Sequence, residues 1–202
     1  ANGQGWCTSG FVAKKTSGTA LGVLTAGHCG LANATYYNPW PPYPAYSMPR
    51  LSPWAWSSTG DFAFYHSSKM MDAWFQYVIS NGSPVGSPVY QVRNPIANET
   101  VCRFGMSSGT RVCGIVQSAV TATTYGGVYV TGLARMAGWA QGGDSGGPVH
   151  SGTIAIGLTM ASNTIGGVPV KSGPDAKMWF TVIKHAEAGT GTKVCREPVT
   201  TC

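Results

Sequence analysis

The sequence has few charged side chains for its length. Lys, Arg, Asp and Glu together make up 10% of the 202 residues, and the formal net charge is +6. The basic residues are scattered, since Lys14 and Lys15 form their only adjacent pair. A nucleic-acid surface usually requires a clustered basic stripe. We therefore expect no nucleic-acid partner.

Long apolar runs are also absent, and the first residues show no signal-peptide pattern. No run is long enough to cross a bilayer, and the first residues lack the basic and then apolar pattern of a signal peptide. The chain begins with Ala1 rather than Met. These features predict a processed, secreted protein with no membrane partner.

The six cysteines lack the CxxC spacing of metal sites. An even number without that spacing predicts disulfides and an oxidising, extracellular compartment. No ligand cluster indicates a catalytic metal ion, and we expect no cofactor; the sequence leaves open a structural calcium ion bound by surface carbonyls. Six cysteines allow 15 pairings, but their grouping along the chain favours three pairs, Cys7 with Cys29, Cys102 with Cys113, and Cys195 with Cys202.

Repeats, low-complexity linkers and long helical patterns are missing, whereas glycine (28) and proline (13) are plentiful. Short runs rich in Val, Thr, Ile and aromatics, such as GVYVTGLA and TIAIGLTM, are bounded by turn residues and predict strands. Gly126 and Gly127 lie between two such runs and predict a two-residue hairpin turn. The chain is therefore predicted to be all-β and a single domain, 1–202. One short helix is expected over about 176–188, with Gly189 as its stop.

The segment from Tyr36 to Trp56 differs from the rest because it holds six prolines and seven aromatics. Proline removes backbone donors, so we expect an ordered surface loop rather than a central strand. Its aromatics either pack over a sheet edge, which we favour, or form a platform for a sugar or another polymer.

The stretch QGGDSGGPV, residues 141–149, places Ser145 among glycines. Such residues are typical of turns, and a serine is a weak nucleophile without a base whose tautomer a third group fixes. His28 is the best base, because it adjoins Cys29 and follows small residues that permit close packing. The other histidines, His66, His150 and His185, are interpreted as surface or cap residues.

Asp61 is the best third group among the seven acids. It opens the apolar run DFAF, where a carboxylate is costly without a partner. Asp144 is too close to Ser145 in sequence to orient His28. The remaining acids are expected to be solvated: Asp72, Glu99, Asp175, Glu187 and Glu197.

TAGHC around His28, GDFAF around Asp61 and GDSGGP around Ser145, in that order, resemble the secreted serine peptidases of the chymotrypsin fold. The stretch TVCRFGMSSGTRVCG is similar to the bacterial branch of streptogrisins and α-lytic-type proteases. The resemblance implies two packed six-stranded antiparallel β-barrels, the first over about 1–85 and the second over about 86–180. The catalytic triad would lie at their seam.

The resemblance also implies a role for each site residue. His28 would act as general base and then acid, oriented by Asp61, while Ser145 is the nucleophile. The backbone N–H groups of Gly143 and Ser145 would form the oxyanion hole. Asp144 would pair with Arg103 to support this loop.

By family position, the specificity pocket would come from residues 138–141 and 158–163. These windows contain no acid and no base, so the pocket is predicted to be neutral and to accept apolar side chains. Asp175 is the one acid that would overturn this by entering it. The streptogrisin disulfide beside the nucleophile is absent here. The expected pocket residues are Trp139, Ala140, Gln141, Thr159, Met160, Ala161 and Ser162, with Trp139 and Met160 narrowing it.

The sequence therefore predicts a secreted, monomeric serine endopeptidase. Its expected partners are peptide or protein substrates, a removed propeptide and proteinaceous inhibitors. By analogy, the strand GLTMAS would offer backbone groups to an extended substrate. Two alternatives are a non-catalytic peptidase homologue and a polymer- or carbohydrate-binding module that uses the Tyr36 to Trp56 aromatics.

Overall fold

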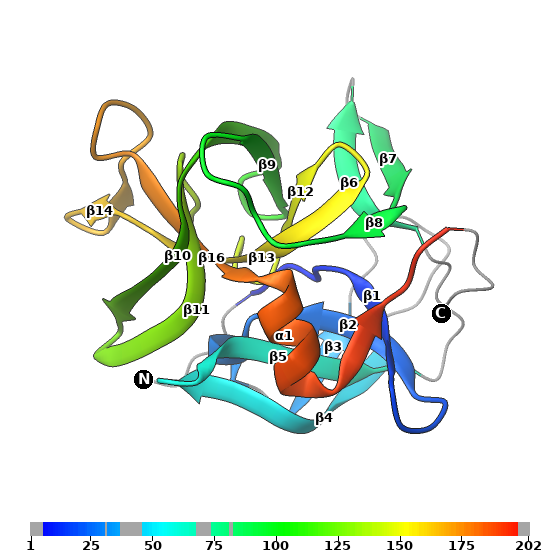
Figure 1. Cartoon of the computed structure of the whole chain (residues 1–202). Helices are drawn as coiled ribbons and strands as arrows, with labels where there is room; N and C mark the ends of the chain where they lie inside the picture. The colour runs from blue at the N-terminus through cyan, green and yellow to red at the C-terminus, as the bar shows by residue number, and fades with distance from the viewer. Residues whose placement is uncertain (1–5, 31, 37–45, 68–73, 81–82, 198–202) are drawn as a thin grey trace.

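A computed structural model describes residues 6–30, 32–36, 46–67, 74–80 and 83–197 of the chain. Two sheets lie one above the other, with the single described helix in front of them (Figure 1). The all-β prediction with one short helix is confirmed. In the described part of the chain no helix is long and apolar enough to span a membrane.

The first sheet has six strands in the order β17-β1-β2-β5-β4-β3. It is antiparallel throughout. β17 comes from the far end of the chain, so the first sheet is not made from residues before 85 alone. The boundary at about 85 stays a prediction. The strands are β1 (Val12–Lys15), β2 (Leu21–Thr25), β3 (Asn33–Tyr36), β4 (Tyr46–Ser57), β5 (Gly60–His66) and β17 (Thr192–Val194).

The second sheet has seven strands in the order β12-β9-β10-β11-β16-β13-β8, and β12 also pairs with β13. Only β8 runs parallel to its neighbour. The strands are β8 (Gln91–Val92), β9 (Thr100–Gly105), β10 (Thr110–Tyr125), β11 (Val128–Ala137), β12 (Pro148–Ser151), β13 (Ile154–Ser162) and β16 (Lys177–Val182). Two small hairpins complete the fold, β6 (Trp74–Ser80) with β7 (Ser83–Pro88) and β14 (Thr164–Ile165) with β15 (Val168–Pro169).

The turn between β10 and β11 is the two-glycine hairpin that the sequence predicts. Gly126 and Gly127 have φ of 57° and 80°, the left-handed values of a type I′ turn. The hairpin places Tyr125 directly opposite Val128. It therefore sets the register of the two longest strands of the second sheet.

The helix α1 spans Ile183–Thr190, so the prediction of a helix from about 176 was wrong for its first part. Residues 177–182 form β16 instead, between β11 and β13. Partners on both sides satisfy the backbone of this segment, which overrides its helical spacing of apolar residues. The helix ends at Gly191, in the left-handed conformation, rather than at Gly189.

The segment from Tyr36 to Trp56 also differs from its prediction. Residues 46–57 form β4, an interior strand between β3 and β5, and not a surface loop. Pro53 is tolerated because it lies in a register shift between Leu51 and Ala55, where no ladder donor is required. Residues 37–45 lie outside the described residues.

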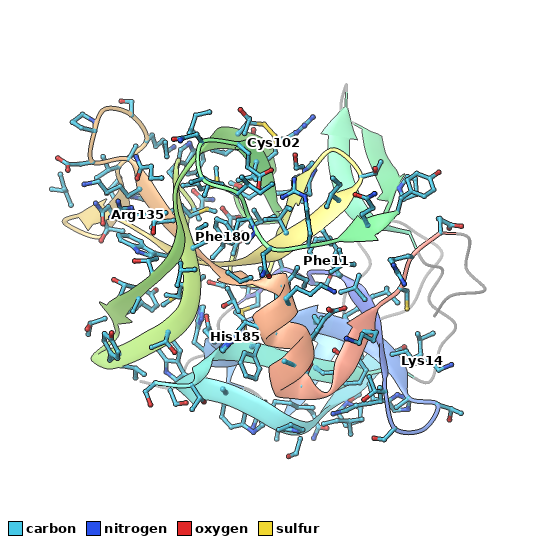
Figure 2. The ribbon with its side chains drawn as sticks, in the orientation of Figure 1. Phe11, Lys14, Cys102, Arg135, Phe180 and His185 are labelled. Carbon is cyan, nitrogen blue, oxygen red and sulfur yellow. A yellow bond between two sulfur atoms is a disulfide. The ribbon has the colours of Figure 1, made fainter. Side chains whose placement is uncertain are left out.

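The largest core cluster joins the two sheets. On the side of the first sheet, Phe11, Leu24 and Phe64 belong to this cluster. They pack with Leu158 of β13 and Ile183 of α1, and all five side chains are 0% exposed. Phe180, labelled with Phe11 in Figure 2, belongs to a second cluster inside the second sheet. Apolar burial of this extent holds the seam between the sheets rigidly.

Two side chains expected at the surface are buried. Glu187 is 3% exposed, accepts a hydrogen bond from the Val194 N–H at 2.8 Å and pairs with Lys184. His150 of β12 is 2% exposed, and its Nδ1 lies 3.0 Å from the Gly152 carbonyl oxygen. Burial lowers the pKa of His150 from 6.5 to about 4, with a smaller contribution from Arg111.

His150 predicts an acid sensitivity of folding. Because the unfolded chain binds this proton more tightly than the folded one, the free energy of unfolding should fall by about 3 kcal/mol between neutral pH and about pH 4. Urea unfolding across this range measures the slope. His150→Gln should flatten this slope, because the variant has no histidine to protonate. The free energy of unfolding of the variant near pH 8, compared with that of the wild type, gives the part of the change that comes from lost packing. An unchanged slope in His150→Gln would contradict the assignment.

Candidate active site

His28 is held in a short turn by covalent and steric constraints. The turn η1 (Gly27–Cys29) follows β2, and Cys29 is bonded to Cys7. A side chain at Gly27 would collide with the Ala55 backbone, so only glycine permits this close approach. The imidazole is 15% exposed. Its orientation is therefore set by the backbone around it.

Asp61 lies at the start of β5 and is 0% exposed. Its Oδ1 accepts a hydrogen bond from the His28 backbone N–H at 2.8 Å, and its Oδ2 lies 2.8 Å from His28 Nδ1. The Asp61 carbonyl oxygen accepts a hydrogen bond from the Thr181 hydroxyl at 2.7 Å. Both oxygens of the buried carboxylate therefore have a hydrogen-bond partner on His28. The hydrogen bond from Thr181 links the Asp61 strand to the second sheet.

Ser145 lies across the seam from the other two residues. Its Oγ is 2.8 Å from His28 Nε2 and 3.4 Å from the Met160 carbonyl oxygen. The structure therefore brings together the three residues that the motifs single out, in a continuous line from carboxylate to imidazole to hydroxyl. A neutral imidazole in this line has Nδ1–H facing Asp61 and a free Nε2 lone pair facing Ser145.

Two aromatic side chains that sequence reasoning did not assign to the site cover His28. The ring centroid of Trp56 lies 5.2 Å from that of the imidazole, and the Tyr125 centroid lies 5.7 Å away. Trp56 is the last residue but one of β4, and Tyr125 is the last residue of β10, next to the two-glycine turn. No local signal links them to the histidine, because the strand order of the first sheet brings Trp56 there and the packing of the second sheet against it brings Tyr125.

The loop before Ser145 is held by a buried ion pair. Arg103 Nη1 lies 2.8 Å from Asp144 Oδ2, and both side chains are 0% exposed. Burial lowers the pKa of Arg103, while the Asp144 charge opposes this shift. Asp144 also accepts hydrogen bonds from the backbone N–H groups of Ser108 and Gln141. The Asp144 carboxylate is therefore held by three groups, the Arg103 guanidinium and the two backbone N–H groups, and this fixes the loop.

The backbone around Ser145 leaves two donors available. Gly143 has φ of 94° and Gly146 has φ of 82°, which favour glycine. In the part of the chain that the structure describes, the backbone N–H groups of Gly143 and Ser145 have no acceptor. Unpaired donors at a tight turn beside a serine hydroxyl that faces a histidine are suited to bind an oxyanion.

Thr8 is a further support that sequence reasoning missed. Its hydroxyl donates a hydrogen bond to the Gly143 carbonyl oxygen at 2.8 Å and accepts one from the Met106 N–H at 3.0 Å. Its own N–H donates to the Ser145 carbonyl oxygen at 2.8 Å. Thr8 adjoins Cys7, so the disulfide to Cys29 anchors it. A threonine after a cysteine carries no recognisable signal in the sequence.

The expected pocket segments lie side by side. The Ser162 hydroxyl donates a hydrogen bond to the Ala140 carbonyl oxygen at 2.6 Å and joins them. Asp175 adjoins the second segment, because its carbonyl oxygen accepts a hydrogen bond from Asn163 Nδ2 at 3.0 Å. Its side chain is 71% exposed and its Oδ1 lies 3.4 Å from Lys177 Nζ. Lys171, which the sequence windows did not include, lies 4.5 Å from the ring centroid of Trp139. The buried members are Ala140, Thr159, Met160 and Ala161, and the partly exposed ones are Trp139, Gln141 and Ser162.

Two of the three expected disulfides are present. Cys7 is bonded to Cys29, and Cys102 to Cys113 across the β9–β10 ladder. Cys195 is disulfide-bonded, and Cys202 lies outside the described residues. No group of three or more His, Cys, Asp or Glu suited to a metal ion occurs among the described residues.

The fold and this line of side chains define a serine protease of the two-sheet, chymotrypsin type. The chain is 30% identical over 161 residues to Serine protease 2 of Streptomyces fradiae, covering 79% of this chain and 88% of that protein. It is 31% identical over 163 residues to Streptogrisin-C of Streptomyces griseus, covering 78% of this chain but 32% of that longer protein. The chain belongs to the streptogrisin-like bacterial serine proteases, a family of peptide-bond hydrolases.

A solved structure agrees with this assignment. Protease A of Thermobifida fusca superposes with a TM-score of 0.71 at 25% identity, over 96% of this chain and 94% of that one. No protein-family model matches the sequence.

The ion pair beneath the loop predicts a large effect of Arg103→Ala. The substitution leaves a buried carboxylate without its cation, so the free energy of unfolding should fall by about 3–5 kcal/mol. Catalytic turnover should fall with it, because the Gly143 and Ser145 donors lose their support.

Urea unfolding and peptide hydrolysis measure the two effects. Arg93→Ala is the matched control, because its partner Glu99 is partly solvated and the loss should stay within about 1 kcal/mol. An Arg103→Ala protein as stable and active as the wild type would refute the role of the pair.

Proposed function

We propose that the protein is a secreted serine endopeptidase that acts through Ser145, His28 and Asp61. The observation that carries the proposal is the line of two 2.8 Å contacts, Ser145 Oγ to His28 Nε2 and His28 Nδ1 to Asp61 Oδ2. The disulfides support an extracellular location. A removed propeptide, proteinaceous inhibitors and a monomeric state remain predictions.

The proposed first step is attack of Ser145 Oγ on the carbonyl carbon of a substrate peptide bond. His28 Nε2 takes the hydroxyl proton as the new C–O bond forms. Asp61, with its Oδ2 facing Nδ1, stabilises the imidazolium and keeps the ring in the reactive tautomer. The carboxylate is 0% exposed, so solvent screens its attraction for the imidazolium only weakly.

The negative charge that develops on the carbonyl oxygen is received by the N–H groups of Gly143 and Ser145. His28 then gives its proton to the leaving amine, and the acyl group stays on Ser145. A water molecule, deprotonated by His28, hydrolyses this ester and restores the hydroxyl. No cofactor is needed for either half of the reaction.

We propose that the residue before the cleaved bond is apolar and uncharged. The buried pocket segments contribute Ala140 and Met160, and Ala140 belongs to an apolar cluster with Met136, Met178 and Phe180. A charged substrate side chain would be buried there without a partner, which is costly. Lys171 is exposed and lies against the face of Trp139.

The two alternatives receive less support. A non-catalytic homologue would be expected to lack one of the three aligned residues, and all three are present. A polymer-binding surface would require free aromatics, but Trp56 packs against His28 and the Arg50 guanidinium lies 3.6 Å from the Trp54 ring centroid.

Chemical labelling tests the nucleophile directly. A serine-directed phosphonate or sulfonyl fluoride should modify Ser145, as mass spectrometry of the digested protein will show. Ser145→Ala should fold, take no label and lose roughly a millionfold in turnover. Ser151→Ala, which removes a hydroxyl on β12, should label as the wild type does. A folded wild-type protein that takes no label would rule out the proposed enzyme.

The pocket proposal is tested with peptides that differ only in the residue before the cleaved bond. Leu or Met should give values of kcat/KM at least about tenfold above those of Arg or Glu, because the pocket offers a charge no partner. Lys171→Gln should leave this order unchanged. A clear preference for Arg or Glu in the wild type would overturn the neutral pocket.

A further inference from the structure

Three residues form a row across the second sheet. In the strand order β11-β16-β13, Arg135 lies directly opposite Trp179, and Trp179 lies directly opposite Ala161. Directly paired residues of antiparallel strands project from the same face. The row is therefore one continuous strip, spanning two strand spacings or about 10 Å. Figure 2 labels Arg135 at one end of it.

This strip leads away from the catalytic residues. The next row on the same face pairs Leu133 with Thr181, whose hydroxyl binds the Asp61 carbonyl oxygen. Leu133, Met160 and Ala161 form a core cluster against which Trp179 and Trp56 pack. Trp56 in turn covers His28. Trp179 thus continues the aromatic surface of the active site, and Arg135 follows it.

Arg135 is a cation with no carboxylate partner among the residues that the structure describes. It is in no ion pair within the part of the chain that the structure describes, and its Nε is buried there without a hydrogen-bond partner. Of the six acids in that part, Asp61, Glu99, Asp144, Asp175 and Glu187 each face another base, and Glu197 is in no ion pair there. A buried guanidinium donor is costly to leave unpaired. Its planar fork fits a carboxylate.

The geometry of β13 indicates which substrate residue meets this strip. The pairing of β12 with β13 ends at Leu158, so beyond it β13 pairs only with β16. The open edge can accept an extended peptide as an added antiparallel strand. The residue attacked by Ser145 lies beside Met160, whose carbonyl oxygen is 3.4 Å from Ser145 Oγ. The second and fourth residues before the cleaved bond then project on the same side as Ala161.

We propose that Arg135 and Trp179 form a subsite that selects an acidic side chain at the fourth residue before the cleaved bond. The second residue meets Trp56 and His28, whereas the fourth extends over Trp179 towards the guanidinium. The inference rests on the proposed peptidase function, which it deepens by naming a class of substrate. The net charge of +6 also favours the approach of acidic peptides.

The test uses peptides that are identical except for Glu, Gln, Lys or Leu at that fourth position. At low ionic strength the wild type should cleave the Glu peptide with kcat/KM about fivefold above the Gln peptide, and further above the Lys peptide. The ratio should shrink as salt is added, because the pair is partly exposed to solvent. A wild type indifferent to the charge at this position would overturn the proposal.

Variants of Arg135 separate charge from packing. R135K should keep the preference for Glu, R135Q should treat Glu and Gln alike, and R135E should favour Lys. Lys193→Gln is the matched control, because it removes one exposed positive charge from β17 of the other sheet. The Glu preference should persist in this control. If Lys193→Gln lost the Glu preference to the same extent as R135Q, the preference would come from the net charge of the protein, and the subsite would be refuted.

Titration of Ser145 with the phosphonate keeps the two proposals apart. Complete labelling and rapid cleavage without any charge preference would refute the subsite and leave the peptidase intact. Absence of both labelling and cleavage in the folded protein would refute the peptidase, and the subsite with it. The expected result is complete labelling in the wild type and in all four variants, with the charge preference changing only in R135Q and R135E.

Discussion

The buried ion pair between Arg103 and Asp144 is the interaction on which the site depends. Neither side chain has any exposed surface, so each charge would be very costly without the other. Their attraction draws the loop before Ser145 inwards, and the Ser108 and Gln141 N–H groups hold the same carboxylate. The glycines on either side of Asp144 and Ser145 allow the backbone to turn sharply above this anchor. A turn that would be mobile in isolation is thereby rigid.

The same principle of anchoring recurs at the other site residues. His28 is fixed by the Cys7–Cys29 disulfide and by a glycine pressed against the next strand. Asp61 is fixed by its two bonds to His28 and by Thr181 from the second sheet. Each side chain is therefore held by contacts to a segment distant in sequence. Geometry this well supported suits a site that must stabilise a transition state without rearranging.

Much of this was predictable, and the errors have a common origin. Motifs with fixed spacing and unusual residue types identified the candidate residues and the family, and turn residues such as Gly126 and Gly127 identified a hairpin. Residues 177–182 were expected in a helix and residues 46–56 in a loop, yet the first form β16 and the second lie in β4 (Tyr46–Ser57). In each case neighbouring strands on both sides supply backbone partners that local patterns do not reveal. His150 and Glu187 were expected at the surface for the same reason, since burial depends on what the rest of the chain packs against them.

The sequence by itself determined the class of the protein, its all-β character and the side chains proposed to carry the chemistry. These follow from short-range features, because turn residues, motif spacing and apolar alternation act within a few positions along the chain. Only the tertiary structure decided that Trp56 and Tyr125 cover His28, that Thr8 supports the Gly143 carbonyl, and that Arg135 and Trp179 lie in one row with Ala161. Those arrangements join segments far apart in the chain, and the register of the strands and the packing of two sheets set them.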